Sequence, residues 1–160
     1  MIFAYADPPY PGMAHFYPEN TEVDHGVLFT RLCSEYPDGW ALSTASTTLR
    51  QVLAFPQCPA DVRIMAWVKP FASFKLHVNP AYAWEPVLVR GGRRRTREQT
   101  TVRDWVSANI TLRTGLVGAK PPGFYHWLRE VLNVQPGDRL DDLYPGTGGL
   151  AKMMAQETLL

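Results

Sequence analysis

Cysteine is scarce in this chain of 160 residues, which contains only Cys33 and Cys58. Two cysteines provide neither the disulfide framework of a small secreted domain nor a zinc-binding spacing, so we expect reduced thiols. The four histidines are also without metal-ligand spacing; they are His15, His25, His77 and His126. The sequence therefore predicts no bound metal, and an organic molecule is the expected kind of cofactor.

Long apolar runs are also lacking. None approaches the roughly 18 residues of a membrane span, and residues 1–7 lack the charged-then-apolar layout of a secretory signal. Apolar residues make up 46% of the chain and charged residues 19%, a balance that excludes a disordered or fibrous protein. We expect one soluble domain over residues 1–160, cytoplasmic in a bacterial cell or a phage-infected host.

Short apolar runs alternate with amphipathic segments, the pattern of an α/β domain with a largely parallel sheet. Strands are expected at residues 2–6, 40–44, 62–68, 82–89 and 139–144. Helices are expected at residues 25–36, 47–54, 122–133 and from 150 onward. Ser46 is the expected N-cap of the second helix. The pattern over residues 102–118 favours neither a helix nor a strand.

Arginine is concentrated in one segment. Between residues 90 and 103 the sequence has one acid, Glu98, and these arginines: Arg90, Arg93, Arg94, Arg95, Arg97 and Arg103. Because paired glycines open the segment, we expect residues 90–101 to form a basic, flexible loop. A solvated surface loop is one reading of such a segment, and a phosphate-binding loop is the other.

Two corners follow predicted strands. One is Asp7-Pro8-Pro9-Tyr10, and the other is the glycine-rich stretch over residues 142–148. In an open α/β sheet, ligands bind at the carboxyl ends of strands, so two such corners would face one cleft. Each also has a purely structural reading, as a rigid strand exit or as a tight strand-to-helix turn.

Together and in this order, the corners resemble those of S-adenosylmethionine-dependent methyltransferases that modify exocyclic amines of bases. That family has an (Asp/Asn/Ser)-Pro-Pro-(Tyr/Trp/Phe) corner and an Asp-Pro-Phe-x-Gly-Ser-Gly corner. The first is matched by residues 7–10, and the second by residues 142–148 with departures at Leu143 and Thr147. The catalytic corner comes first in circularly permuted members of the family, as it does here.

Three further stretches extend the resemblance over nearly the whole chain. Lys120-Pro121 matches a pair that opens a helix before the glycine-rich strand. The stretches at residues 67–69 and 85–91 resemble the W-x-K and E-x-x-L-x-x-x-G motifs of bacterial DNA adenine methyltransferases and messenger-RNA adenosine methyltransferases. The implied fold is Rossmann-like, a mostly parallel sheet with flanking helices, truncated relative to the full seven-stranded form.

The resemblance implies a catalytic set of Asp7, Pro8, Pro9 and Tyr10. An aromatic amine is a poor nucleophile because its lone pair is delocalised into the ring. The Asp7 carboxylate and the Pro8 carbonyl would accept hydrogen bonds from the amine and localise that pair. Tyr10 would stack on a flipped base and favour the cationic sulfonium. Methylation at cytosine carbon would instead need a nucleophilic cysteine, and Cys58 is expected to be structural.

The same resemblance implies a cofactor set and a nucleic-acid set. S-adenosylmethionine would be bound by Asp7, Lys120, Asp142, Tyr144, Gly146, Thr147 and Gly148, with Lys120 on the cofactor carboxylate and Asp142 near its amino group. For Lys120 the alternative is a solvated lysine at a helix start. DNA, with RNA less favoured, would be contacted by Lys69, Arg93, Arg94, Arg95 and Arg97.

The sequence also departs from the family. An acid that holds ribose hydroxyls lies about 20 residues past the glycine-rich corner in dinucleotide-type folds, whereas this sequence ends at Leu160. We therefore expect a cofactor pocket completed elsewhere, by a second copy or a partner protein. The second hypothesis is a catalytically impaired methyltransferase fold that binds nucleic acid or a partner. Methylation of the cytosine amine or of a protein side chain is a third, disfavoured by Asp at the start of the corner.

Overall fold

The structure is a computed structural model that describes residues 1–17, 20–71, 77–110, 119–146 and 148–157. Its elements in chain order are β1 (Ile2–Ala6), η1 (Ala14–Phe16), α1 (His25–Glu35), β2 (Gly39–Ser43), α2 (Leu49–Leu53), β3 (Arg63–Val68), β4 (Trp84–Gly91), β5 (Trp105–Ser107), α3 (Pro122–Leu132), β6 (Arg139–Asp142) and α4 (Gly149–Glu157). None of the described helices is long and apolar enough to cross a membrane.

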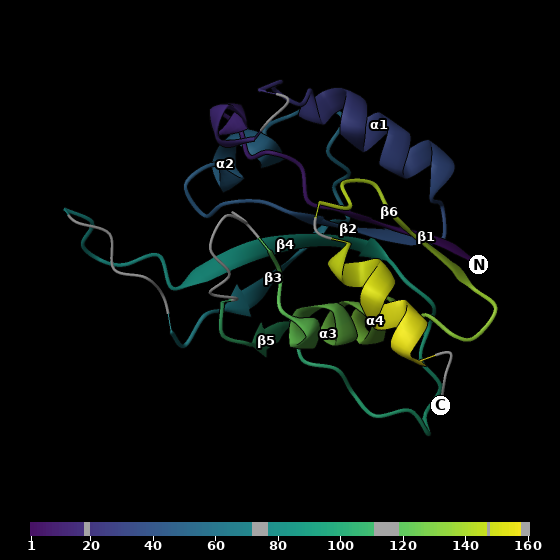
Figure 1. Ribbon diagram of the computed structural model, residues 1–160. Helices are drawn as coiled ribbons and strands as arrows, with labels where there is room; N and C mark the ends of the chain where they lie inside the picture. The colour runs from purple at the N-terminus through teal and green to yellow at the C-terminus, as the bar shows by residue number, and fades with distance from the viewer. Residues whose placement is uncertain (18–19, 72–76, 111–118, 147, 158–160) are drawn as a thin grey trace.

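The strands form one six-stranded sheet in the order β5-β3-β4-β2-β1-β6 (Figure 1). β1 pairs in parallel with β2 and β6, and β3 pairs in parallel with β5. β4 is antiparallel to both of its neighbours, β2 and β3. All strands but β4 therefore run in one direction, which confirms the predicted, mostly parallel sheet.

Helices cover both faces of the sheet: α1 and α2 lie on one side, and α3 and α4 on the other (Figure 1). β1 shows how the two cores are divided. Phe3 and Tyr5 pack with α3 and α4, whereas Ala4 and Ala6 pack with α1. A strand buried on both faces must be apolar at every position, which is why residues 2–6 read as a continuous apolar run.

Most predicted elements are confirmed within a few residues, and the expected N-cap of the second helix needs correction. Ser46 is not the N-cap of α2, which begins at Leu49 after Thr48. The Thr48 hydroxyl donates to the Ala45 carbonyl over 3.3 Å, so a turn occupies the positions expected to be helical. The ambiguous residues 102–118 contribute the short strand β5, and residues 111–118 lie outside the described part.

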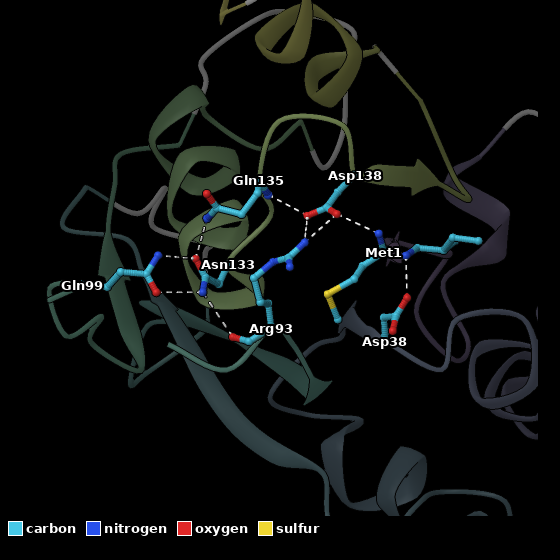
Figure 2. A network of polar contacts seen from close by, with 8 residues as sticks. Met1, Asp38, Arg93, Gln99, Asn133, Gln135 and Asp138 are labelled. Carbon is cyan, nitrogen blue, oxygen red and sulfur yellow. Dashed lines mark hydrogen bonds and ion pairs between the residues drawn. The ribbon is translucent and has the colours of Figure 1, made fainter. Parts of the chain in front are cut away.

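Asp138 is the centre of a polar network at the amino-terminal ends of β1 and β6 (Figure 2). Arg93 Nη2 lies 2.6 Å from both carboxylate oxygens of Asp138. The same carboxylate accepts from the Met1 ammonium and from the Gln135 backbone amide, each over 2.8 Å. The start of the arginine-rich segment is thereby fixed to the turn that precedes β6.

Asn133 links the same segment to the end of α3. It is the C-cap residue of α3 in the left-handed conformation, and its side chain is buried. Its amide exchanges hydrogen bonds with the Gln99 side chain over 3.1 and 3.2 Å, and it donates to the Arg93 carbonyl over 3.3 Å (Figure 2). The predicted flexible loop is therefore anchored at both Arg93 and Gln99.

We expect Asp138→Asn to lower the melting temperature by a few degrees at neutral pH. Hydrogen bonds from the Met1 ammonium and from Arg93 hold the pKa of Asp138 far below its ordinary value. This stabilisation is present above the pKa of an unfolded aspartate, near 4, and is lost as pH falls through the lowered folded pKa. Thermal unfolding at pH 7 and pH 3 measures it, and the deficit should shrink at pH 3.

The matched control is Asp104→Asn. The Asp104 carboxylate is exposed and forms a loose ion pair with Arg63 over 3.9 Å. Such surface pairs contribute little to stability. Equal melting temperatures for Asp138→Asn and Asp104→Asn would contradict the anchoring role of Asp138.

Candidate active site

The two sequence corners meet at one edge of the sheet. Tyr5 of β1 is registered against Asp142 of β6, so Asp7 follows two residues beyond the end of the pairing with Asp142. β4 enters this edge from the opposite direction, and its second residue, Glu85, lies near the same end. Three carboxylates from three strands thus come to the carboxyl edge of the parallel strands, where ligands bind in open α/β sheets.

Lys120 lies between two of these carboxylates. Its Nζ donates to Asp7 Oδ1 over 2.8 Å and to Oδ2 over 2.7 Å. The same nitrogen is 3.6 Å from Glu85 Oε2. Only 2% of the Lys120 side chain is exposed, so the reading of Lys120 as a solvated helix-start lysine is wrong.

Glu85 accepts hydrogen bonds from two further side chains, those of Lys69 and Tyr10. Lys69 Nζ donates to Oε1 and the Tyr10 hydroxyl donates to Oε2, each over 2.9 Å. The Tyr10 hydroxyl is also 3.5 Å from Asp7 Oδ1. We call these five residues the acid–lysine cluster: Asp7, Tyr10, Lys69, Glu85 and Lys120. Its two carboxylates and two ammonium groups balance, as buried charges require.

Aromatic rings complete the surroundings of the two ammonium groups. Lys120 Nζ lies 5.6 Å from the Trp67 ring centroid and 5.8 Å from that of Tyr10. Lys69 Nζ lies 5.5 Å from the Trp67 ring. The Trp67 indole is itself fixed, since Nε1 donates to the Ala108 carbonyl over 2.8 Å. Each ammonium is thus held by a carboxylate and a ring face together.

Burial and neighbouring charges shift the pKa values of the acid–lysine cluster in opposite directions. Burial raises the pKa of Asp7 above its ordinary value, and the charge of Lys120 offsets this only in part. Burial would raise the pKa of Glu85 as well, but Lys120 and Lys69 together bring it below its ordinary value. Burial alone would lower the pKa of Lys120, but Asp7 and Glu85 raise it. Glu85 is therefore the firmly ionised acid, and Asp7 is the stronger base.

The glycine-rich corner follows β6 and leads into α4. Asp142 Oδ1 accepts from the Tyr144 backbone amide over 3.3 Å. Gly146 and Gly148 have φ of 45° and 69°, a region that side chains rarely adopt. α4 then begins at Gly149, so the corner leads directly into the amino-terminal end of a helix, where backbone amides favour anionic groups. Thr147, a predicted cofactor residue, lies outside the described residues.

Tyr125 of α3 is a site residue that the sequence did not reveal. A Cβ on Gly149 would lie 2.7 Å from the Tyr125 ring, so the start of α4 packs on this tyrosine only because residue 149 is glycine. Burial, with the nearby charge of Asp7, raises the pKa of Tyr125 to about 12. The spacing of apolar residues predicts that α3 is amphipathic. That spacing does not distinguish Tyr125 from the residues of the core.

The corner also provides a test of fit for a cationic ligand. Asp142 is half-buried; burial raises its pKa, and the charge of Asp7 adds to the effect. A cation beside Asp142 would relieve that cost, while Gly146 and Gly148 leave the backbone open to close approach. These residues fit a ligand that carries an ammonium and a sulfonium, as S-adenosylmethionine does.

The predicted arginines lie away from this edge. β4 runs from Glu85 at the site to Gly91 at the other end of the sheet, about 20 Å at 3.3 Å per residue. Arg93 is paired with Asp138, and Arg95 donates to Glu130 Oε2 over 3.1 Å. Phosphate contact by these two arginines therefore conflicts with their contacts inside the chain. It stays a prediction for Arg94 and Arg97, which are exposed.

Of the residues predicted from sequence, the structure brings together Asp7, Tyr10, Lys69, Lys120 and Asp142. The sequence places Glu85 only within a motif, and the structure shows that Glu85 joins Tyr10 to both lysines. Contact of Lys120 with a cofactor carboxylate stays a prediction, because its described carboxylate partners are Asp7 and Glu85.

No family model and no curated protein matches the sequence. Among solved structures, the crystal structure of the M1.HpyAVI-SAM complex has a TM-score of 0.66 and 12% sequence identity, covering 96% of this chain and 77% of that one. The crystal structure of M1.HpyAVI has a TM-score of 0.60 and 12% identity, covering 96% and 75%. The chain thus has a Rossmann-like methyltransferase fold, as predicted, and one solved example of this fold holds S-adenosylmethionine.

Proposed function

We propose that the chain is an S-adenosylmethionine-dependent methyltransferase that methylates the exocyclic amino group of adenine in DNA. The observation that carries the proposal is the meeting of two corners on neighbouring strands: Asp7-Pro8-Pro9-Tyr10 after β1 and Asp142 at the end of β6. Support for the cofactor comes from the fold, since a solved structure with this fold contains S-adenosylmethionine. Adenine and DNA rest on the sequence resemblance.

The glycine-rich corner would hold the cofactor. Asp142 would accept from its ammonium, and the turn over Gly146 and Gly148 would let the backbone approach it closely. When bound, S-adenosylmethionine supplies an electrophilic methyl group. Tyr125, beneath the start of α4, would set the depth of this part of the site.

Asp7 and Pro8 would activate the amine. A carboxylate has about four lone-pair sites, so Asp7 can hold Lys120 and still accept a hydrogen bond from the amine. The Pro8 carbonyl would accept from the second N–H. As the nitrogen lone pair formed the new N–C bond, the bond from that methyl carbon to sulfur would break and leave its electron pair on a neutral thioether. The methylated nitrogen would then be acidic and would lose a proton. Burial raises the pKa of Asp7, which makes it a better acceptor for that proton.

Glu85 and the lysines would position these groups. Glu85 accepts from the Tyr10 hydroxyl, so the ring that would stack on the base has a fixed tilt. Lys69 and Lys120 keep Glu85 ionised, and Lys120 aligns the Asp7 carboxylate through both oxygens. The cluster thus preorganises the amine acceptor before the substrate arrives.

The second candidate is a methyltransferase fold that binds nucleic acid or a partner without catalysis. The observation in its favour is that Lys120 engages both oxygens of Asp7. The two candidates differ in cofactor binding, because a catalyst must bind S-adenosylmethionine.

Isothermal titration with S-adenosylmethionine is therefore the first test. We expect saturable binding, weakened about 10- to 100-fold in Asp142→Asn through the loss of one charge-assisted hydrogen bond. Asp141→Asn is the matched control, since the neighbouring carboxylate bonds Tyr36 and Arg139 instead. An absence of heat for the unaltered chain would favour the second candidate. Equal affinity for Asp142→Asn and the unaltered chain would contradict the role of Asp142.

A further inference from the structure

A hollow of about 360 Å³ lies at the end of the sheet away from the acid–lysine cluster. It is formed by the start of β3, the segment before β5 and the last turn of α3. Its lining includes four arginines and one carboxylate: Arg63, Arg95, Arg97, Arg103 and Asp104. We call it the arginine hollow. The proposed transfer of a methyl group makes no use of it.

Three of these guanidinium groups are available to a ligand. The Arg95 guanidinium donates to Glu130 and to the Thr100 carbonyl, so Arg95 forms part of the lining of the hollow. Arg63 lies 3.9 Å from Asp104, and 68% of its side chain is exposed. Arg97 and Arg103 are exposed, and the described part of the chain shows no carboxylate paired with either. The lining therefore carries a net positive charge, and the side chains of Arg63, Arg97 and Arg103 are exposed.

Trp105 orients one of these donors. The Arg103 guanidinium carbon lies 5.2 Å from the Trp105 ring centroid, and the ring is 41% exposed. A guanidinium held over an aromatic face keeps its N–H groups directed outward in its own plane. Arg103 can then pair bidentately with an anion such as phosphate at a small entropic cost.

The hollow and the active site lie at opposite ends of one strand. β3 begins at Arg63 in the hollow and ends at Val68, next to Lys69 of the acid–lysine cluster. Six residues span about 20 Å. Phosphates of one B-DNA strand advance 3.4 Å per nucleotide along the helix axis, so a duplex whose axis lies along β3 would place about six nucleotides over this span.

We propose that the arginine hollow binds backbone phosphates of the DNA substrate about six nucleotides from the target base. The phosphate contacts come from Arg63, Arg97 and Arg103. Arg95 has a structural role in the lining. The inference rests on the proposed function for the identity of the substrate. The arginine hollow would hold the DNA at a second point, away from the active site. Its phosphate contacts would position the duplex and carry no sequence information.

The test compares two double variants of equal charge. Arg97→Gln with Arg103→Gln removes two hollow contacts. Arg31→Gln with Arg50→Gln removes two exposed arginines from α1 and α2, on the other face of the sheet. Binding to a fluorescent 20-base-pair duplex is followed by anisotropy at several salt concentrations.

We expect the hollow variant to bind at least about tenfold more weakly. Its slope of log affinity against log salt should fall by about 2, at 0.9 per phosphate contact. Its titration with S-adenosylmethionine should be unchanged, which shows that the fold is intact. The control variant should bind DNA like the unaltered chain.

An unchanged slope in the hollow variant, or an equal loss in the control, would overturn the inference. An assay of methyl transfer tests the proposed function separately from the hollow. DNA binding that depends on the hollow, without any methyl transfer by the unaltered chain, would contradict the proposed function and leave the hollow supported. Methyl transfer with a raised KM and an unchanged kcat in the hollow variant supports both.

Discussion

Asp7→Asn is expected to lower kcat for methyl transfer by about 10²- to 10⁴-fold, the usual range for a positioned acid–base or electrostatic group. Asparagine keeps the shape of the side chain and one oxygen acceptor. It loses the negative charge that localises the amine lone pair and takes the proton. It also keeps an acceptor for Lys120, whereas alanine would remove the carboxylate that binds this buried ammonium through both of its oxygens.

The measurement is the initial rate of labelled methyl transfer to adenine-containing DNA. Asp61→Asn is the control, because its exposed carboxylate pairs with Arg90 outside the acid–lysine cluster. A rate for Asp7→Asn close to that of the control would remove Asp7 from the mechanism. The pH profile gives a second reading: since burial raises the pKa of Asp7, the rate should fall on the acid side at a pH above the ordinary aspartate pKa.

Lys120→Met should give the largest loss of stability. Removing one partner of a buried ion pair costs about 3–5 kcal/mol, because the other charge stays buried without compensation. At about 2–4 °C per kcal/mol for a chain of this size, the melting temperature should drop by about 10 °C. The buried carboxylates of Asp7 and Glu85 would then lose the ammonium group that they share, while Glu85 would keep its contacts with Lys69 and the Tyr10 hydroxyl.

The loss should depend on pH. Without Lys120, the folded-state pKa of Asp7 would lie further above its unfolded value, so the cost is absent below the unfolded pKa and complete above the folded one. The deficit in melting temperature should therefore be larger at pH 7 than at pH 4. Lys152→Met, at an exposed position on α4, is the control. Lys120→Arg should recover part of the stability; a Lys120→Met chain as stable as the control would contradict the buried pair.

The strands and helices were largely predictable because their limits are set by local chemistry. Residues 2–6 are apolar at every position and end at two prolines, and α1 begins where Asp24 caps its first amides. Strand direction is not local: the two-residue period is the same in parallel and antiparallel strands. The antiparallel course of β4, which brings Glu85 to the active site, was therefore not predictable from the pattern.

The partners of charged residues were the least predictable feature. Lys120 reads as an ordinary lysine before a helix, and it becomes buried because α3 packs on the face of the sheet that carries Trp67. Arg93 reads as part of a solvated basic run, and its partner Asp138 lies in a turn far along the chain. The position of ligand sites at the carboxyl ends of strands correctly predicted that Asp7 and Asp142 share one edge of the sheet, but it could not predict these pairings.

The measurement that tests the central proposal most directly is mass analysis of nucleosides after reaction. Adenine-containing DNA is incubated with the chain and with S-adenosylmethionine that carries a deuterated methyl group, and is then digested to nucleosides. We expect deuterated N6-methyl-2′-deoxyadenosine with the unaltered chain and nearly none with Asp7→Asn. DNA without deuterated methyl groups, or with the label on cytosine instead, would contradict it.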